Sequence, residues 1–158
     1  VHSLFSIGGN MLRTILLTTL LGFSLAAGVP AIAQTAAKDA AHASAKHKVV
    51  LQVSDNDPKK WTLALNNANN IQKDIGRDNV EIEVVAYGPG IGMLKLDSPV
   101  AQRIQDALTA DIKVVACQNT MRGQHLTKED MLAEIGYVPS GVVELMKKEE
   151  AGYAYLRP

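Results

Sequence analysis

A regular alternation of two patterns along the chain constrains its fold more than any other feature. Short apolar runs rich in β-branched residues are typical of buried strands, and they cover residues 49–53, 80–87 and 112–116. Longer segments with apolar residues three or four positions apart are typical of amphipathic helices, and they cover residues 58–75, 99–110 and 140–152. Strands that alternate with helices are joined by crossovers, so the pattern predicts parallel strands.

The predicted fold class is α/β, with a single three-layer domain built around a mostly parallel sheet and flavodoxin-like in character. The strands are nearly continuously apolar, as expected when helices cover both faces of a sheet. A last short strand is expected over residues 153–156.

Capping residues support the predicted helix boundaries. Asp57 is suited to cap the first helix, which would begin at Pro58 and stop at Gly76. Ser98 is suited to cap the second helix. The segment Thr127–Asp130 resembles a capping box and predicts a helical turn there.

Residues 1–33 have the pattern of an N-terminal extension followed by a signal peptide. Arg13 is the only charge ahead of an apolar run over residues 15–27, and Ala31–Ala33 matches a cleavage site. The run is shorter than the roughly 20 apolar residues that a membrane span needs. We therefore expect cleavage after Ala33 and a periplasmic or secreted protein that is not membrane-bound after cleavage, with a retained membrane anchor as the alternative.

Residues 34–47 are alanine-rich and show no apolar periodicity, so they predict a flexible tail ahead of a domain over residues 48–158. His42 and His47 in this tail would have no fixed geometry for a metal ion. Removal of Arg13 with the leader leaves 16 − 1 = 15 Lys and Arg against 16 Asp and Glu. A near-neutral domain favours neither nucleic acid nor an anionic membrane as a partner.

Cys117 is the only cysteine of the chain, and it follows a predicted strand directly. The carboxyl ends of parallel strands meet at one edge of a sheet, where α/β proteins bind their ligands. Asp55 and Asn56 follow the first strand, so they should line the same edge as Cys117. Polar residues after Cys117 indicate that the chain leaves the core there, so we expect a partly open thiol with Asn119 and Arg122 near its sulfur. A nearby cation would favour the thiolate.

Other site motifs are absent or incomplete. Residues 88–92, with the sequence GPGIG, lack the spacing of phosphate-binding loops, and a tight turn explains them. His125 lies eight residues after Cys117 and is a weak candidate for the base of a cysteine-protease-like pair. A lone cysteine forms no internal disulfide, and neither a C-x-x-C motif nor a zinc-binding spacing occurs. We therefore expect no metal site.

Four segments together resemble the DsrE/DsrF-like family, in its exported subgroup. They are VVLQVSDNDPKKWTLALNNANNIQKDIG, VEIEVVAYGPGIGML, VVACQNTMRGQHLTKEDML and VPSGVVELMKKEEAGYAYLRP, within residues 48–158. The C-x-N-T motif ahead of T-K-x-D-[ML], with the V-P-S-G-V-V segment, is the most specific combination.

The resemblance implies a doubly wound α/β sheet, a homo-oligomer (commonly a trimer or hexamer) and no organic cofactor. It also implies that Cys117 accepts sulfur and carries it as a persulfide between partner proteins. The best understood members are cytoplasmic and act with two sister subunits and a small carrier protein, whereas this chain has an apparent export signal.

Two classes of function remain open at this point. In the first, Cys117 transfers sulfane sulfur from a donor protein to an acceptor protein, with Asn119, Arg122, Asp55 and Asn56 in support, as a sulfur carrier or sulfurtransferase-like protein at most. In the second, the chain is a non-catalytic, homo-oligomeric binding module with a structural cysteine. In either case we expect subunits to associate, with the last strand and Trp61 as candidate contacts.

Overall fold

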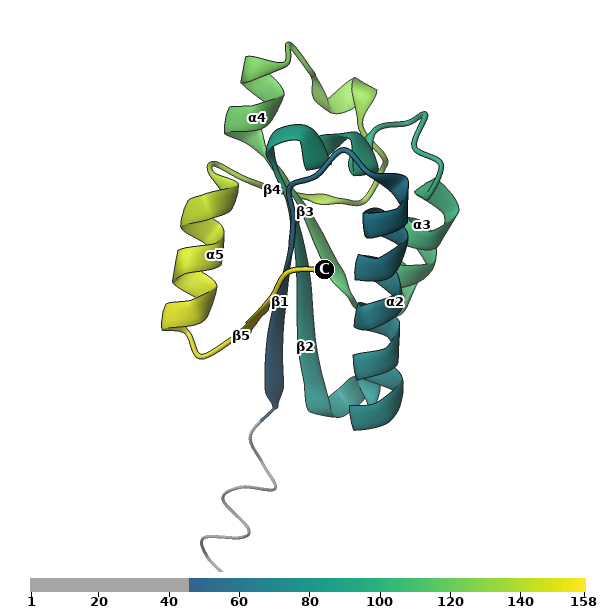
Figure 1. Cartoon of the computed structure of the whole chain (residues 1–158), viewed down its shortest axis with the longest axis vertical. Coiled ribbons are helices and arrows are strands. Elements are labelled where there is room, and N and C mark those ends of the chain that lie inside the picture. The colour runs from purple at the N-terminus through teal and green to yellow at the C-terminus, as the bar shows by residue number, and fades with distance from the viewer. Residues whose placement is uncertain (1–45) are drawn as a thin grey trace, which may run out of the picture. The chain divides into compact units, whose positions relative to one another are not determined.

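Five parallel strands form one sheet, in the order β4-β3-β2-β1-β5 (Figure 1). The strands are β1 (His47–Val53), β2 (Val80–Ala86), β3 (Lys113–Cys117), β4 (Gly136–Val138) and β5 (Ala154–Leu156). The structure is a computed structural model that describes residues 46–158. The expected extension, signal peptide and cleavage site, and most of the expected tail with His42, lie outside the described residues. The predicted α/β fold with a mostly parallel sheet is confirmed.

Helices cover the two faces of the sheet unequally (Figure 1). One face carries α2 (Pro58–Ile75) and α3 (Ala101–Thr109), the other carries α5 (Gly141–Glu150), and α4 (Gln118–Gly123) lies beyond the carboxyl ends of the strands. Right-handed crossovers explain this arrangement. The steps from β1 through β2 and β3 to β4 run in one direction across the sheet, and the step from β4 to β5 runs back, which puts its helix on the opposite face.

Two apolar cores of different size lie on the two faces. The larger one packs α2 and α3 against the sheet through side chains such as Leu65, Val84 and Ile104. The smaller one contains Val50, Val85, Val115, Leu145 and Tyr153. Because Leu145 is the only large apolar side chain of α5 that is buried, this helix depends on further contacts to stay on the sheet.

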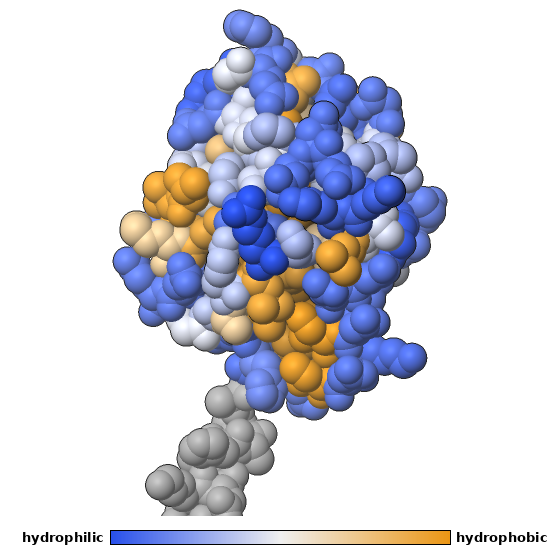
Figure 2. All heavy atoms as spheres, viewed as in Figure 1, coloured by the Kyte–Doolittle hydropathy of each residue, from blue (hydrophilic) through white to orange (hydrophobic). Residues whose placement is uncertain are grey.

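The outward face of α5 is apolar, whereas a surface helix normally turns its apolar side inward. Val142, Val143 and Met146 are 55%, 40% and 53% exposed. Figure 2 shows hydrophobic side chains at the left of the view, where Figure 1 places α5. Charged residues lie on the inward side instead, where Lys148 pairs with Glu83 of β2. Three neighbouring exposed apolar residues on one helix form a patch that suits contact with another molecule.

The predicted boundaries of the first helix are confirmed at both ends. The Asp57 side chain accepts a backbone N–H of the first turn at 2.8 Å, and Pro58 is the first residue of α2. The helix stops at Gly76, whose φ of +96° suits glycine. The capping box predicted for Thr127–Asp130 is also present and starts the 3-10 turn η3 (Lys128–Asp130).

Several boundaries differ from the prediction by one to three residues, and three of them bear on the site or on the described range. Helix α3 begins at Ala101 because the Ser98 hydroxyl accepts the Val100 N–H at 3.3 Å and belongs to a turn ahead of the helix. Strand β3 runs one residue further than expected and ends with Cys117. Strand β1 begins at His47, which the prediction had placed in the tail.

The sequence analysis missed α4 and β4, which are six and three residues long. The expected turn at residues 88–92 lies within a longer 3-10 helix, η2 (Gly88–Leu94). Its glycines serve close packing, since a Cβ on Gly90 would lie 2.4 Å from the carbonyl oxygen of Val53.

Candidate functional site

The carboxyl ends of β3 and β4 form a switch point of the sheet. After β3 the chain passes through α4 on the side of the larger core, to which Met121 and Met131 belong. After β4 it crosses to the other face as α5. Cys117 ends β3 directly opposite Val138, the last residue of β4. Parallel α/β proteins typically bind ligands where two neighbouring strands send the chain to opposite faces in this way.

Backbone N–H groups from two helix starts converge on the Cys117 sulfur. Gly141, the first residue of α5, donates its N–H to Sγ at 3.2 Å. Cys117 is also the N-cap residue of α4, so the N–H groups of Asn119 and Thr120 face its side chain. The Asn119 N–H also donates to the Pro139 carbonyl oxygen at 3.2 Å, which ties α4 to the segment ahead of α5.

Burial and these donors shift the pKa of the Cys117 thiol in opposite directions. Burial raises the pKa of Cys117, because a thiolate loses its hydration in the protein interior. Hydrogen bonds from the Thr120 hydroxyl and from the N–H groups of Gly141, Thr120 and Asn119 act in the opposite direction. They outweigh burial, so the pKa of Cys117 is lowered from its ordinary value of 9.0. A lowered pKa favours the thiolate, which is the nucleophilic form of cysteine.

The expectation of a partly open thiol is wrong, because Cys117 is only 4% exposed. The chain does not leave the core at this residue, which is the last of β3. The start of α5 then packs closely over the neighbouring strand end. A Cβ on Gly141 would lie 2.8 Å from the Cβ of Tyr87, so only glycine allows this approach.

Asn119 and Arg122 lie on α4, but within residues 46–158 their side chains form no hydrogen bond with the Cys117 sulfur. The Arg122 guanidinium donates to the Asn119 side-chain oxygen, and both residues are exposed. Asn119 acts on the thiol through its backbone instead. Within residues 46–158 no hydrogen bond joins Arg122 or the candidate base His125 to Cys117.

Asp55 and Asn56 lie at the expected sheet edge, after β1, but β2 separates β1 from β3. The Asp55 carboxylate pairs with Lys60 at 3.1 Å and with Arg157 at 3.7 Å. Asn56 lines a separate cavity beside α2. The structure therefore brings neither residue into a hydrogen bond or ion pair with Cys117 in the described part of the chain.

Two residues of the site were given no role by the sequence analysis. Thr120 lies in the C-x-N-T motif and Gly141 in V-P-S-G-V-V, so both motifs pointed to the right segments. Gly141 lies 24 residues after Cys117. Nothing in the sequence indicates that the two segments meet at one sulfur.

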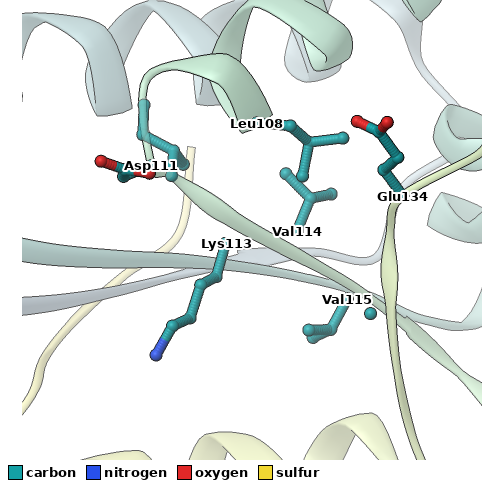
Figure 3. A pocket seen from close by; sticks show the side chains of 8 residues that line it. Leu108, Asp111, Lys113, Val114, Val115 and Glu134 are labelled. Carbon is teal, nitrogen blue, oxygen red and sulfur yellow. The ribbon is translucent and has the colours of Figure 1, made fainter.

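Several cavities of the described domain lie away from the thiol. One of about 430 Å³ lies beside the first half of β3, where β4 has not yet begun (Figure 3). Leu108 and Val114 form its apolar wall. The charged side chains of Asp111, Lys113 and Glu134 already bond to other side chains. The cavity thus offers no free charged group for ligand recognition.

Residues 46–158 contain no cluster of three or more histidine, cysteine, aspartate or glutamate side chains arranged to hold a metal ion. In the same range, no helix has the length and apolar character required to cross a bilayer.

The fold and the cysteine define a class, namely small parallel α/β proteins with one cysteine at a switch point of the sheet. The DsrE/DsrF-like family matches residues 33–158, and the chain belongs to this family. None of the curated proteins compared with it matches its sequence.

Three solved structures are similar to this chain. A protein of unknown function from Methanobacterium thermoautotrophicum is 30% identical, with a TM-score of 0.68, and the match covers 72% of this chain and all of that one. A conserved protein of unknown function from Bacteroides thetaiotaomicron is 16% identical, with a TM-score of 0.54 and coverage of 70% and 94%. The ychN protein from E. coli is 12% identical, with a TM-score of 0.55 and coverage of 72% and 99%. The last two support the fold alone.

Proposed function

We propose that this protein accepts sulfane sulfur on Cys117 and passes it to another thiol. The observation that carries the proposal is the position of the sulfur between two helix starts, where the Gly141 N–H of α5 donates to Sγ at 3.2 Å and Cys117 is itself the N-cap residue of α4. Hydrogen-bond donors that point at one atom stabilise negative charge there, and both the thiolate and a deprotonated persulfide are anions. Membership of the DsrE/DsrF-like family supports the same assignment, because the resemblance implies a sulfur acceptor at this position.

The proposed step is an exchange that needs no external oxidant or reductant. The Cys117 thiolate attacks the outer sulfur of a donor persulfide, R–S–SH, and a new S–S bond forms at Cys117 Sγ. The S–S bond of the donor breaks, and its electron pair leaves with the inner sulfur as R–S⁻. Attack by an acceptor thiolate on the outer sulfur of the loaded cysteine reverses these roles and restores the Cys117 thiolate. The protein is then a sulfur carrier and no more than sulfurtransferase-like.

Intact-mass spectrometry tests the proposal directly because the chain has one cysteine. Reduced protein is incubated with inorganic polysulfide, freed of excess reagent and weighed. We expect a gain of about 32 Da that dithiothreitol removes, as for a persulfide. The variant Cys117→Ser should fold and gain no mass, and an equal gain in that variant would overturn the assignment.

The burial of Cys117 favours a second candidate function, a non-catalytic binding module in which the cysteine is structural. A thiol that is 4% exposed is poorly placed to meet another protein without local opening. Reaction with iodoacetamide in the folded state separates the two candidates. Rapid alkylation whose rate reaches half of its maximum below pH 9 agrees with a sulfur carrier. A thiol that reacts only when the chain unfolds agrees with the binding module.

We further propose that the protein forms a homo-oligomer. The apolar outward face of α5, with Val142, Val143 and Met146, and the exposed strand β5 support this. Trp61 is not a candidate contact, because it is 4% exposed and donates its indole N–H to a backbone carbonyl at 2.7 Å. Light scattering at micromolar concentration tests the assembly, and a monomer would contradict it.

Export, with cleavage after Ala33, belongs to the same proposal and is supported by the leader-like pattern of residues 1–33. N-terminal sequencing of the protein from the periplasm tests it. A mature chain that begins at Gln34 is expected, and a full-length chain in the membrane fraction would contradict it.

A further inference from the structure

The residue Gly88, which opens the GPGIG segment after β2, holds α4 at two points. Its N–H donates to the Thr120 hydroxyl oxygen at 2.8 Å. Its carbonyl oxygen accepts from the Gln124 side-chain amide at 3.2 Å. Gly88 has a φ of +53°, and no atom lies within 4 Å of where its Cβ would be, so glycine is favoured here by conformation and not by space. Gly88 thus forms hydrogen bonds with the first turn of α4 and with the residue that follows its end.

The bond from Gly88 sets the direction of the Thr120 hydroxyl group. A threonine hydroxyl has one hydrogen to donate and accepts through its oxygen. Because the oxygen accepts the Gly88 N–H, the hydroxyl hydrogen remains available to donate to another group. Thr120 is the third residue of α4 and Cys117 is its N-cap. Side chains at these two positions lie next to each other, as in a capping box.

We propose that Thr120 is a positioning residue for sulfur transfer, which accepts the Gly88 N–H and donates its own hydroxyl hydrogen to the Cys117 sulfur. The inference rests on the proposed use of Cys117 as a thiolate. In a chain of this kind the first bond strengthens the second, because a hydroxyl whose oxygen accepts a hydrogen bond is a better donor. The GPGIG segment then acts on the thiol through Thr120.

Among the groups near the sulfur, the Thr120 hydroxyl is the one that fits the role of positioning the thiolate. Its hydroxyl is the leading cause that lowers the pKa of Cys117 against the effect of burial, ahead of the N–H groups of Gly141, Thr120 and Asn119. On α4, the nearby cation of Arg122 is bonded to the Asn119 side chain. Tyr87, which follows β2, packs its ring against the start of α5, and burial raises the pKa of its hydroxyl, so it is uncharged at neutral pH. Within residues 46–158, no charged side chain forms a hydrogen bond with the Cys117 sulfur in place of the Thr120 hydroxyl.

The test compares three Thr120 variants with a matched control elsewhere in the full chain. Thr120→Val and Thr120→Ala remove the hydroxyl, and Thr120→Ser keeps it. Thr109→Val makes the same change on α3, where the hydroxyl donates to a carbonyl of its own helix at 2.9 Å. The rate of alkylation of the single cysteine by iodoacetamide is measured from pH 5 to pH 10, and circular dichroism checks the fold.

Loss of the hydroxyl should raise the midpoint of the alkylation profile by about one pH unit, the scale of a hydrogen bond to an ion. The alkylation rate at pH 6 should then fall about tenfold, because each unit of pKa reduces the thiolate fraction tenfold below the midpoint. Thr120→Ser and Thr109→Val should retain the midpoint of the unmodified protein. Comparison of the alanine and serine variants isolates the hydroxyl even where valine disturbs the packing.

Two results would overturn the inference. The first is a midpoint for the folded alanine variant that equals that of the unmodified protein. The second is a serine variant that is as impaired as the alanine variant, which would show that the threonine methyl group is what matters. Polysulfide loading of the unchanged protein is measured alongside. If loading fails while the midpoint still depends on the hydroxyl, the proposed function falls, and what stands is the hydrogen bond from Thr120 to the Cys117 thiolate.

Discussion

Replacing Lys148 by methionine tests the buried ion pair that holds α5 on the sheet. The Lys148 ammonium lies 2.6 Å from one carboxylate oxygen of Glu83, and the lysine side chain is 16% exposed. Glu83 itself is 3% exposed, and its second oxygen has no hydrogen-bond partner among the described residues. Methionine keeps most of the length of lysine and removes its charge, so the variant leaves a buried and unpaired carboxylate.

We expect Lys148→Met to lower the free energy of unfolding by about 3–5 kcal/mol at neutral pH, the usual cost of breaking a buried pair on one side. Burial raises the pKa of Glu83 above its ordinary value of 4.5, and the bond with Lys148 opposes this, so the pKa rises further in the variant. The folded variant therefore binds the proton more tightly than the unfolded chain. The contribution of Glu83 to the stability of the variant is therefore fully present below pH 4.5 and is lost as the pH rises through the raised pKa.

Urea unfolding, followed by the fluorescence of the single tryptophan, measures this loss from pH 4 to pH 8. Lys113→Met is the matched control, because Lys113 pairs with Glu81 at 2.9 Å but is 58% exposed, and such pairs contribute about 0–1 kcal/mol. The double variant Glu83→Gln with Lys148→Met should recover much of the loss. The reasoning is refuted if Lys148→Met costs no more than Lys113→Met, or if its loss does not shrink as the pH falls.

Three further predictions follow from close contacts and exposed surface. Gly90→Ala should cost about 3 kcal/mol or more in urea unfolding, because a Cβ there would lie 2.4 Å from a carbonyl oxygen of β1, and a loss below 1 kcal/mol would contradict this contact. Gly141→Ala should push the start of α5 away from Tyr87 and raise the midpoint of Cys117 alkylation, while Gly123→Ala, which meets no atom within 4 Å, should not. Met146→Asp should reduce self-association in light scattering without unfolding the chain, and unchanged assembly would exclude this face as the interface.

The periodic elements of this protein were predictable from its sequence because their signals are local. An 18-residue helix such as α2 repeats its apolar positions over several turns, and Asp57, Pro58 and Gly76 mark its ends by backbone chemistry alone. The alternation of strands and helices also led to the parallel sheet, and with it to the sheet edge at which Cys117 lies. What the sequence determined about the site was its single thiol and the end of the sheet to which the thiol belongs.

Only the tertiary structure decided how that thiol is held. Elements as short as α4 and β4 carry too few residues for a periodic signal, so the N-cap position of Cys117 on α4 was not visible in the sequence. The hydrogen bond from Gly141 joins residues 24 positions apart, and it exists because α5 crosses to the face opposite α4 at the ends of β3 and β4. Burial raises the pKa of the thiol and the hydrogen-bond donors lower it. The balance depends on which groups the fold brings within hydrogen-bonding distance of the sulfur. The order of polar and apolar residues does not contain these distances. For this reason the polar residues after Cys117 predicted an open thiol, whereas the structure buries it.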